Sequence, residues 1–169
     1  MKIKVGILTV SDRSFRGERE DESGPTIRRL ILENLDAVIA AEGIVPDEID
    51  AIASELIEWC DEKGLDLILT TGGTGFSPRD LTPEATMKVI ERETPGFNEA
   101  MRIDGFKKTP HALLSRGISG IRGKALIINL PGSPKAVSEG LLLVLPAIPH
   151  AIEILTGRSR EEDHTFRAG

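Results

Sequence analysis

Short apolar runs of strand length recur along this chain and are separated by amphipathic helical repeats. Val, Ile, Leu and Ala fill most positions of these runs, which span residues 3–10, 37–45, 65–71 and 125–130. Strands without an alternating polar face are typical of a parallel sheet that helices cover on both faces. Because parallel neighbours need helical crossovers, the sequence predicts an α/β fold, a three-layer α/β/α sandwich with a mostly parallel sheet.

Helices are predicted between and after the strands, where apolar residues recur every three or four positions. Most of them start at a Ser, Thr or Asp cap or at an early proline, and they span residues 23–35, 47–63, 82–93, 97–106, 133–145 and 146–155. Asp47 is the expected N-cap of the second helix, and Thr82 is that of the third. Residues 11–22 carry eight charges and are expected to form a solvated loop.

A length of 169 residues suits one domain, since domains are most often about 100–150 residues long. We expect this domain over residues 1–156, followed by a charged tail over residues 157–169. The hydrophobic fraction of 40% excludes a disordered chain. No run approaches the ~18 uninterrupted apolar residues of a membrane helix, because Pro146 interrupts the longest one, Leu141–Ile148.

The net charge and the cysteine content limit the cellular location and the classes of partner that we expect. With 21 basic and 27 acidic residues the net charge is −6, which counts against a nucleic-acid or anionic-membrane binder. The lone Cys60 cannot form an internal disulfide, and the N-terminus leads into a strand without a signal peptide, so we expect a cytoplasmic protein. An anionic ligand must then be held by local groups or by a metal ion.

Polar loops follow three of the predicted strands, at the carboxyl ends where ligands of open α/β sheets bind. These loops contain Ser11-Asp12, Thr71-Gly72-Gly73-Thr74-Gly75 and Pro131-Gly132-Ser133. In the Gly72–Gly75 loop the glycines would let backbone amides approach an anion, and the hydroxyls of Thr71 and Thr74 would add donors. The alternative is a tight strand-to-helix turn whose glycines need a positive φ.

The Pro131-Gly132-Ser133 segment stands at the start of a predicted helix, where free amides and the positive end of the dipole make an anion site. The alternative is an ordinary N-cap at Ser133, and most helix starts of that kind bind nothing further. If this segment lies beside the Gly72–Gly75 loop, two anion sites share one crevice. That combination suits a nucleotide or a phosphorylated pterin.

Three acidic residues are candidates for a metal site. A carboxylate such as Asp80 beside bound phosphates would be repelled unless Mg²⁺ intervenes, and carboxylates plus substrate phosphates are the usual ligands of that ion. The alternatives are a turn residue for Asp80, an N-cap for Asp47 and a solvated loop residue for Asp12. Basic side chains near the same loops could neutralise phosphate: Arg79, Arg102, Arg116 and Lys135.

Other classes of catalytic site find little support. The histidines His111, His150 and His164 share no ligand spacing, and Cys60 belongs to the apolar face of a helix. We therefore expect neither a zinc site nor a thiol nucleophile. Ser115 could donate a hydrogen bond to a ligand, but no Ser-His-Asp arrangement follows from the spacing.

The loop motifs together resemble those of the molybdenum cofactor biosynthesis family, closest to its molybdopterin adenylyltransferases, which are related to the G domain of gephyrin. The matching segments run in the family's order from residue 5 to about 155. They include Thr70–Gly75, Arg79–Thr86, Asn129–Lys135, Val10–Asp12, Asp21–Gly24, Val45–Asp47, Pro95–Phe97, Met101–Arg102 and Leu114–Arg116. Together these motifs are highly specific.

The resemblance implies Mg²⁺-dependent transfer of AMP from ATP to the phosphate of molybdopterin, giving adenylyl-molybdopterin and pyrophosphate ahead of metal insertion. It implies ligand-phosphate contacts at Gly72–Gly75, and it places Asp80 and Asp47 at the metal and the reacting end. Ser115 and Pro131–Ser133 would contact the pterin or the nucleotide, and Ser11 and Asp12 would line the same crevice. A homotrimer is implied, and the downstream metal-insertion protein is a further expected partner.

A different class of function stays open at this stage. A sister branch of the family shares the Gly-Gly-Thr-Gly core, so the chain could be a non-catalytic molybdopterin-binding or scaffold protein. ATP turnover that depends on molybdopterin would separate the two. The sequence leaves open which loop holds ATP and which holds the pterin.

Overall fold

The computed structural model describes residues 2–158, which form one six-stranded sheet in the order β2-β1-β3-β6-β5-β4. The first four strands of this order are parallel; at the edge, β5 pairs antiparallel with β6, and β4 pairs antiparallel with β5. The strands are β1 (Ile3–Val10), β2 (Ala37–Val45), β3 (Leu67–Thr71), β4 (Arg92–Glu93), β5 (Ser119–Arg122) and β6 (Ala125–Leu130). All four predicted strands are confirmed, whereas β4 and β5 were not predicted.

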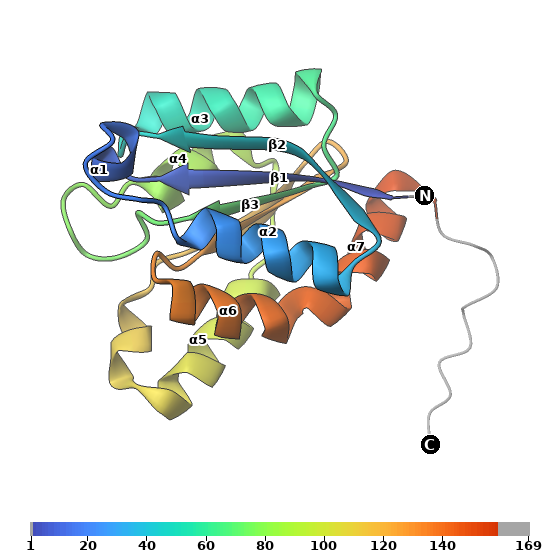
Figure 1. Cartoon of the computed structure of the whole chain (residues 1–169). Helices are drawn as coiled ribbons and strands as arrows, with labels where there is room; N and C mark the ends of the chain where they lie inside the picture. Colours follow the sequence, from blue (N-terminus) through green and yellow to red (C-terminus); the bar gives the residue numbers. More distant parts are fainter. Residues whose placement is uncertain (1, 159–169) are drawn as a thin grey trace.

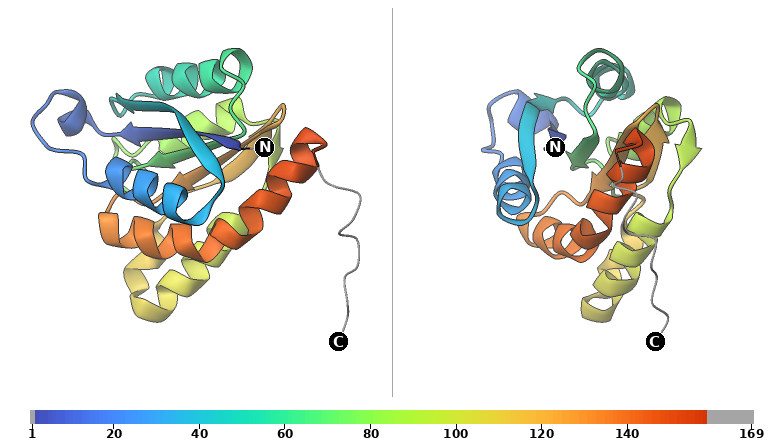
Figure 2. Two further views of the ribbon diagram at one scale, coloured as in Figure 1. Left: turned by 45° about the vertical axis from the view of Figure 1, so that its right-hand side comes forward. Right: turned by 90° about the vertical axis from the view of Figure 1, so that its right-hand side faces the viewer.

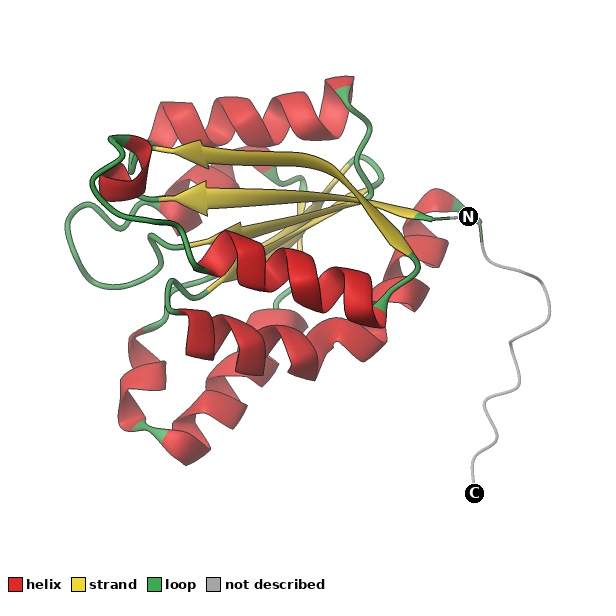
Figure 3. Ribbon diagram, in the orientation of Figure 1, coloured by secondary structure: helices red, strands yellow, loops and turns green. Residues whose placement is uncertain are grey.

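Helices cover both faces of the sheet, which confirms the predicted three-layer α/β/α sandwich (Figures 1 and 3). One layer contains α2 (Ser23–Asn34), α5 (Gly96–Lys108), α6 (Pro134–Val144) and α7 (Ile148–Thr156). The other layer contains α3 (Ile49–Ile57), its π-helical continuation η1 (Glu58–Glu62) and α4 (Thr82–Val89). The turned views in Figure 2 show the sheet between the two layers.

Alternate residues of the central strands supply the two hydrophobic cores. Leu67 and Leu69 pack with α2, α6 and α7, while Ile68 between them packs with α3 and α4. Every residue of β3 and β6 is buried. This two-sided burial explains why the strand sequences are apolar throughout.

Two predicted helix caps are wrong, and both residues serve other contacts. The second helix begins at Ile49 with Glu48 at its N-cap, so Asp47 lies in the loop before it. Leu81 is the N-cap of α4, and the hydroxyl of Thr82 instead donates to Gly72 O at 2.9 Å. The expected loop over residues 11–22 contains a short helix, α1 (Asp12–Phe15), because Ser11 Oγ caps it by accepting from Ser14 N.

Helix α4 ends at Val89, short of the predicted Glu93, because the chain leaves the helix to form edge strand β4. Of the predicted tail, Gly157 closes α7 in the left-handed conformation and Arg158 pairs with Asp66. Residues 159–169 lie outside the described part of the chain.

Among residues 2–158, one segment, Pro134–Thr156, is long and apolar enough to cross a membrane by length and composition. It is divided into α6, a short 3₁₀ turn η3 (Leu145–Ala147) and α7. Leu141, Val144, Leu145 and Ile148 are buried in the core. Packing against the sheet therefore accounts for these four residues, whereas Leu142, Leu143 and Ile154 of the same segment are exposed.

The topology changes direction between β1 and β3. Strand β1 leads through α2 to β2 on one side, whereas β3 leads towards β6 on the other. Ligands of open α/β sheets bind at such a point, outside the carboxyl ends of the strands. In Figure 1 these ends point to the left, where the loop over residues 72–81 projects beyond them.

Asn129 joins several elements beneath that edge of the sheet. Its side chain, in β6, is only 1% exposed, donates to Thr70 Oγ1 at 2.9 Å and Thr86 Oγ1 at 3.0 Å, and accepts from Ile118 N at 3.2 Å. Its carbonyl accepts from Asn98 Nδ2 at 3.0 Å. One buried side chain thus connects β3, β6, α4 and the segment before β5.

We predict that Asn129→Leu lowers the free energy of unfolding by about 2–4 kcal/mol, because the Ile118 amide and two hydroxyls lose a buried partner. Urea denaturation checks this value. The matched control is Asn34→Leu, since Asn34 makes one hydrogen bond, to Leu30 O, on the exposed surface of α2. Equal losses in the two variants would contradict the proposed importance of the buried network.

Candidate functional site

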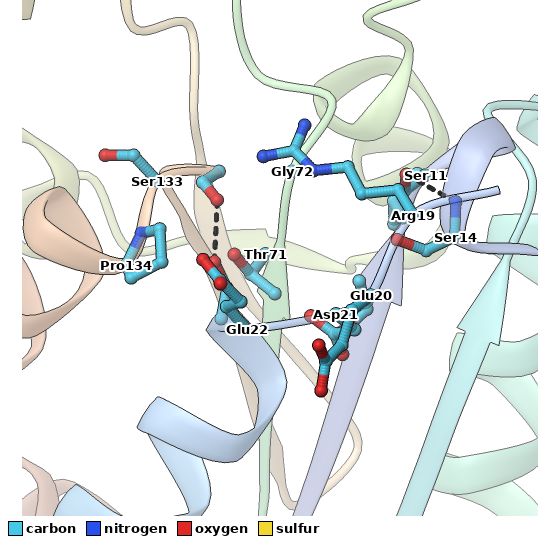
Figure 4. A pocket seen from close by; sticks show the side chains of 14 residues that line it. Ser11, Ser14, Arg19, Glu20, Asp21, Glu22, Thr71, Gly72, Ser133 and Pro134 are labelled. Atoms are coloured by element: carbon cyan, nitrogen blue, oxygen red, sulfur yellow. Dashed lines mark hydrogen bonds between the residues drawn. The ribbon is translucent and has the colours of Figure 1, made fainter. Parts of the chain in front are cut away.

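The loops after β1, β3 and β6 enclose a pocket of about 340 Å³ at the carboxyl edge of the sheet (Figure 4). Five predicted site residues line it: Ser11, Thr71, Gly72, Gly132 and Ser133. Residues from the segment before α2 complete the wall, and Figure 4 shows Glu22 between Pro134 and Asp21. The structure therefore brings together loops that are far apart in the sequence.

Two hydrogen bonds fix the distance between these loops. Thr71 Oγ1 donates to Pro131 O at 2.6 Å, and Ser23 Oγ donates to Gly132 O at 2.7 Å. The first bond uses the hydrogen of the Thr71 hydroxyl, so the prediction that this hydroxyl is a free donor to a ligand is wrong. Thr71 instead positions the neighbouring loop.

Two glycines of the Gly72–Gly75 loop adopt positive φ angles, +93° at Gly72 and +68° at Gly73. A Cβ at Gly72 would lie 2.4 Å from Val10 O, and a Cβ at Gly73 would lie 2.3 Å from Thr82 Oγ1. Both glycines are thus required by a tight turn. Gly72 also lies in the pocket wall, so the two interpretations of this loop, a tight turn and a site for close approach of a ligand, are compatible.

The amino end of α6 faces the same pocket. Ser133 Oγ accepts from Ala136 N at 3.2 Å, which confirms the predicted N-cap, and Pro134 follows in the pocket wall. The remaining amides of the first turn have no carbonyl partner within the helix, and the dipole places partial positive charge there. This end of the pocket favours an anion.

The opposite wall contains charged residues that the sequence interpretation treated as solvated. Arg19, Glu20 and Glu22 line the pocket, and in Figure 4 Arg19 extends across it in the direction of Gly72. Asp21 is held in place because its carboxylate accepts from Thr9 Oγ1 at 2.7 Å and Gly24 N at 3.1 Å. The Asp21–Gly24 motif was the available signal for this wall.

Beside the pocket, Asp12 and Asp47 exchange reciprocal hydrogen bonds. Asp12 N donates to Asp47 Oδ2 at 2.8 Å, and Asp47 N donates to Asp12 Oδ1 at 2.9 Å. Arg79 pairs with Asp12 through Nε and Nη2, both at 2.9 Å, and these bonds lower the pKa of the Asp12 carboxyl. Burial raises the pKa of the Asp47 carboxyl, and the nearby charges of Asp12 and Asp80 raise it further.

Asp80 reaches the same acidic cluster from the loop before α4. Its Oδ2 accepts from Ser77 N at 2.9 Å, and a Cβ at Gly75 would lie 2.8 Å from that oxygen. Within residues 2–158, no cluster of three or more His, Cys, Asp or Glu residues could hold a metal alone. Asp47 and Asp80 each keep one carboxylate oxygen without a hydrogen bond to the described residues, a donor set that suits Mg²⁺ shared with substrate phosphates.

Ser115 lies apart from the first pocket, in a second cavity of about 260 Å³ between α5, α6 and the 3₁₀-helix η2 (Pro110–Leu114). Pro131 lines this cavity, so the two cavities lie on either side of one loop. Asn98 is buried in its wall, and its Oδ1 has no hydrogen-bond partner among the described residues. That oxygen could accept an N–H from a ligand.

The predicted phosphate-binding arginines are engaged within the protein. Arg79 binds Asp12, Arg102 Nη1 donates to Gly117 O at 2.8 Å, and Arg116 Nε donates to Gly75 O at 2.8 Å. The backbone amide of Arg116 also donates to Thr74 O at 2.8 Å. Lys135 is exposed in the first turn of α6.

Cys60 has the properties expected of an unreactive thiol. Burial raises the pKa of its thiol to about 12, so little thiolate forms at neutral pH. It lies in η1, on the α3 side of the sheet. This agrees with the prediction that Cys60 is not a nucleophile.

Comparison with known proteins identifies the family. The model of a family described as "Probable molybdopterin binding domain" matches residues 6–150. The molybdopterin adenylyltransferase of Helicobacter pylori is 48% identical over 156 residues, which cover 92% of this chain and 89% of that protein. The gephyrin of Dictyostelium discoideum is 47% identical, over 92% of this chain and 23% of its own length.

Comparison with solved structures gives the same family. The crystal structure of the molybdopterin biosynthesis enzyme MoaB from Thermus thermophilus superposes with a TM-score of 0.87 at 54% sequence identity, covering 92% of this chain and 97% of that one. Family model, sequence relatives and solved structure agree over the part of the chain that contains both cavities and the acidic cluster. The chain therefore belongs to the molybdenum cofactor biosynthesis family.

Proposed function

We propose that this protein transfers AMP from ATP to the phosphate of molybdopterin in a Mg²⁺-dependent reaction, giving adenylyl-molybdopterin and pyrophosphate ahead of metal insertion. The observation that carries the proposal is the acidic cluster of Asp12, Asp47 and Asp80 beside a pocket whose opposite end favours an anion. Relatives named molybdopterin adenylyltransferase, at 38–48% identity over most of the chain, support the same reaction.

Two adjacent cavities suit a reaction between two ligands. We assign the Gly72 pocket to the phosphates of ATP, because its glycine turn and the amino end of α6 present amides to an anion. Ser115 and the cavity beyond Pro131 would then contact the pterin, where the unpaired Asn98 Oδ1 can accept an N–H from the ring. The loop between the cavities, Pro131–Ser133, is positioned to contact both.

The chemistry needs positioning and charge stabilisation rather than a protein nucleophile. An oxygen of the molybdopterin phosphate forms a bond to the α-phosphorus of ATP as the bond to the bridging oxygen breaks, and pyrophosphate leaves. Asp80 and Asp47 would hold the metal through their free carboxylate oxygens, while Asp12 keeps Asp47 in place. Bound Mg²⁺ supplies positive charge that offsets the phosphates of both substrates.

We predict that Asp80→Asn slows formation of adenylyl-molybdopterin at least a hundredfold with an unchanged melting temperature. Asn keeps the size and the Ser77 hydrogen bond of Asp80 but removes its charge, and losing one electrostatic contact typically costs about 10²–10³ in rate. Product formation and thermal unfolding are measured on one preparation.

The control for this test is Asp36→Asn, an exposed carboxylate before β2, at the opposite edge of the sheet. Near-parental turnover of Asp80→Asn at saturating Mg²⁺ would make Asp80 a turn residue only. A parent protein that binds molybdopterin but never turns over ATP would instead support a non-catalytic binding protein.

A second prediction concerns the Gly72 pocket. Gly132→Val should weaken binding of ATP with Mg²⁺ at least tenfold by calorimetry, because a β-branched side chain there narrows the gap to Gly72. A Cβ at Gly132 makes only ordinary contact, 3.5 Å from Gly72 Cα, so the fold should be retained. Gly96→Val is the matched control, since a Cβ at Gly96 meets open space. If Gly132→Val binds ATP with the parental affinity, the assignment of this pocket to the nucleotide is wrong.

We also propose a homotrimer, as the family resemblance implies, and a cytoplasmic location in which the downstream metal-insertion protein receives the product. Within the expected apolar stretch, Leu141 and Val144 belong to the core, but Leu142 and Leu143 are 47% and 42% exposed. Light scattering at micromolar concentration should report a trimer, and Leu143→Glu should shift it towards smaller species. A monomeric parent would contradict this prediction.

A further inference from the structure

The guanidinium of Arg116 contacts the loop before α4 at two places and α4 itself at a third. Its Nε donates to Gly75 O at 2.8 Å, its Nη2 donates to Asp80 O at 2.6 Å, and its Nη1 pairs with Glu84 in the first turn of α4. Its own amide donates to Thr74 O at 2.8 Å. One guanidinium thus joins both ends of the segment 75–80 to the helix that follows.

The segment between these contacts is tied to the body of the domain by Arg79, which donates to Asp12 through Nε and Nη2, both at 2.9 Å. Phe76 is 68% exposed, and residues 77–79 are exposed as well. Thr82 holds the base of the loop, at Gly72 and Gly73, through its hydroxyl and its amide. Asp80 lies beyond that base, so its backbone position depends on the turn with Ser77, on the neighbouring Arg79–Asp12 pair and on Arg116. Of these groups, Arg116 is the one that binds the carbonyl of Asp80.

The backbone on both sides of Arg116 is fixed by hydrogen bonds, so the side chain starts from a defined position. Arg102, on α5, donates to Gly117 O at 2.8 Å and reaches Ser115 O at 3.4 Å, on both sides of Arg116. Asn129 Oδ1 accepts from the Ile118 amide two residues on. The chain around Arg116 is therefore fixed to α5 and to the buried part of β6.

A guanidinium suits this task better than an ammonium. Its planar fork offers several N–H groups in fixed directions, so Nε and both Nη atoms can bind separate acceptors at once. A lysine ammonium is a compact charge on a flexible stem and cannot reproduce this geometry. Glu84 offsets the charge, and the hydrogen bond from Arg116 lowers the pKa of the Glu84 carboxyl.

We propose that Arg116 is a positioning residue for the reaction: it contacts no substrate, and it holds the backbone of Asp80 where the carboxylate can act. This inference rests on the proposed role of Asp80. It differs from the interpretation of Arg116 as a phosphate ligand, because all three guanidinium nitrogens already have partners on the loop and on α4.

The test is a double-mutant cycle of the parent, Arg116→Lys, Asp80→Asn and the double variant, assayed for adenylyl-molybdopterin formation. Arg116→Lys should lower kcat by about 10–100-fold, since displacing a reacting group by about 1 Å can cost about 10²-fold. If Arg116 acts through Asp80, the double variant is no slower than Asp80→Asn alone. Losses that multiply would overturn the proposal.

An activity-independent measurement accompanies the cycle. Hydrogen exchange of the amides in residues 75–80 should accelerate at least tenfold in Arg116→Lys, while the strands exchange at the parental rate. Parental exchange in this loop would overturn the proposal even if turnover fell. If Asp80→Asn instead keeps full activity, the proposed role of Asp80 is wrong. That outcome is distinct from parental loop exchange in Arg116→Lys, which contradicts only the role of Arg116.

Arg122→Lys is the matched control. Arg122 also binds a carboxylate, Asp61, and a backbone carbonyl, Val89 O at 3.0 Å, but it lies in β5, away from the loop. It should leave kcat and loop exchange unchanged. If Arg116→Lys and a second variant, Arg116→Gln, both unfold the whole domain, Arg116 is a residue of the fold and the proposal is wrong.

Discussion

The hydrogen bond from Thr71 Oγ1 to Pro131 O joins the loop after β3 to the loop after β6, and the site depends on it. Both strands are buried on both faces, so their register is set by the two hydrophobic cores. The loops beyond the strands have no core to order them. The buried hydroxyl of Thr71, the last residue of β3, fixes the position of the loop that contains Gly132 and Ser133 relative to the sheet.

The same principle recurs around the edge of the sheet. Ser23, at the start of α2, binds Gly132 O, Thr82, at the start of α4, binds Gly72 O, and Asp12 and Asp47 bind each other's amides. The Ser23 bond and the Asp12–Asp47 bonds join segments that follow different strands, whereas the Thr82 bond closes the loop after β3. Polar side chains that would serve as helix caps in isolation are here used between loops, which keeps backbone groups paired and the pocket open.

This use of polar side chains also explains where the sequence was informative and where it was not. Elements with a clear apolar pattern were predicted closely because burial alone determines them; β3 is buried on both faces, and α2 has one apolar face. Asp47 and Thr82 were assigned to caps because local spacing carries no information about a partner 35 or 10 residues away. Strand β4, with two exposed residues, has no apolar pattern to detect.

For the site, the spacing of motifs in the sequence identified the loops that lie together at the edge of the sheet, but it did not identify the contacts within them. Gly72, Gly132 and Ser133 were predicted as ligand-binding residues and line the pocket, whereas Gly73 and Gly75 are not in its wall. The wall formed by Arg19–Glu22 was not predicted, because a run of charges is typical of a solvated loop. The role of Asp21 follows only from its contacts with Thr9 and Gly24. Tertiary partners therefore decide which charged residues belong to the site.

The distribution of positive charge has a consequence for how anions can bind. The protein carries a net charge of −6, and Arg79, Arg102 and Arg116 are paired with carboxylates or carbonyls rather than directed at the pocket. The groups in the pocket wall that favour a phosphate are the Gly72 turn, the amino end of α6 and Arg19. Apart from Arg19, they carry only partial positive charge. In the proposed reaction, two phosphorylated substrates beside three carboxylates would need more positive charge than these groups supply, and the divalent cation proposed at Asp47 and Asp80 would meet that need.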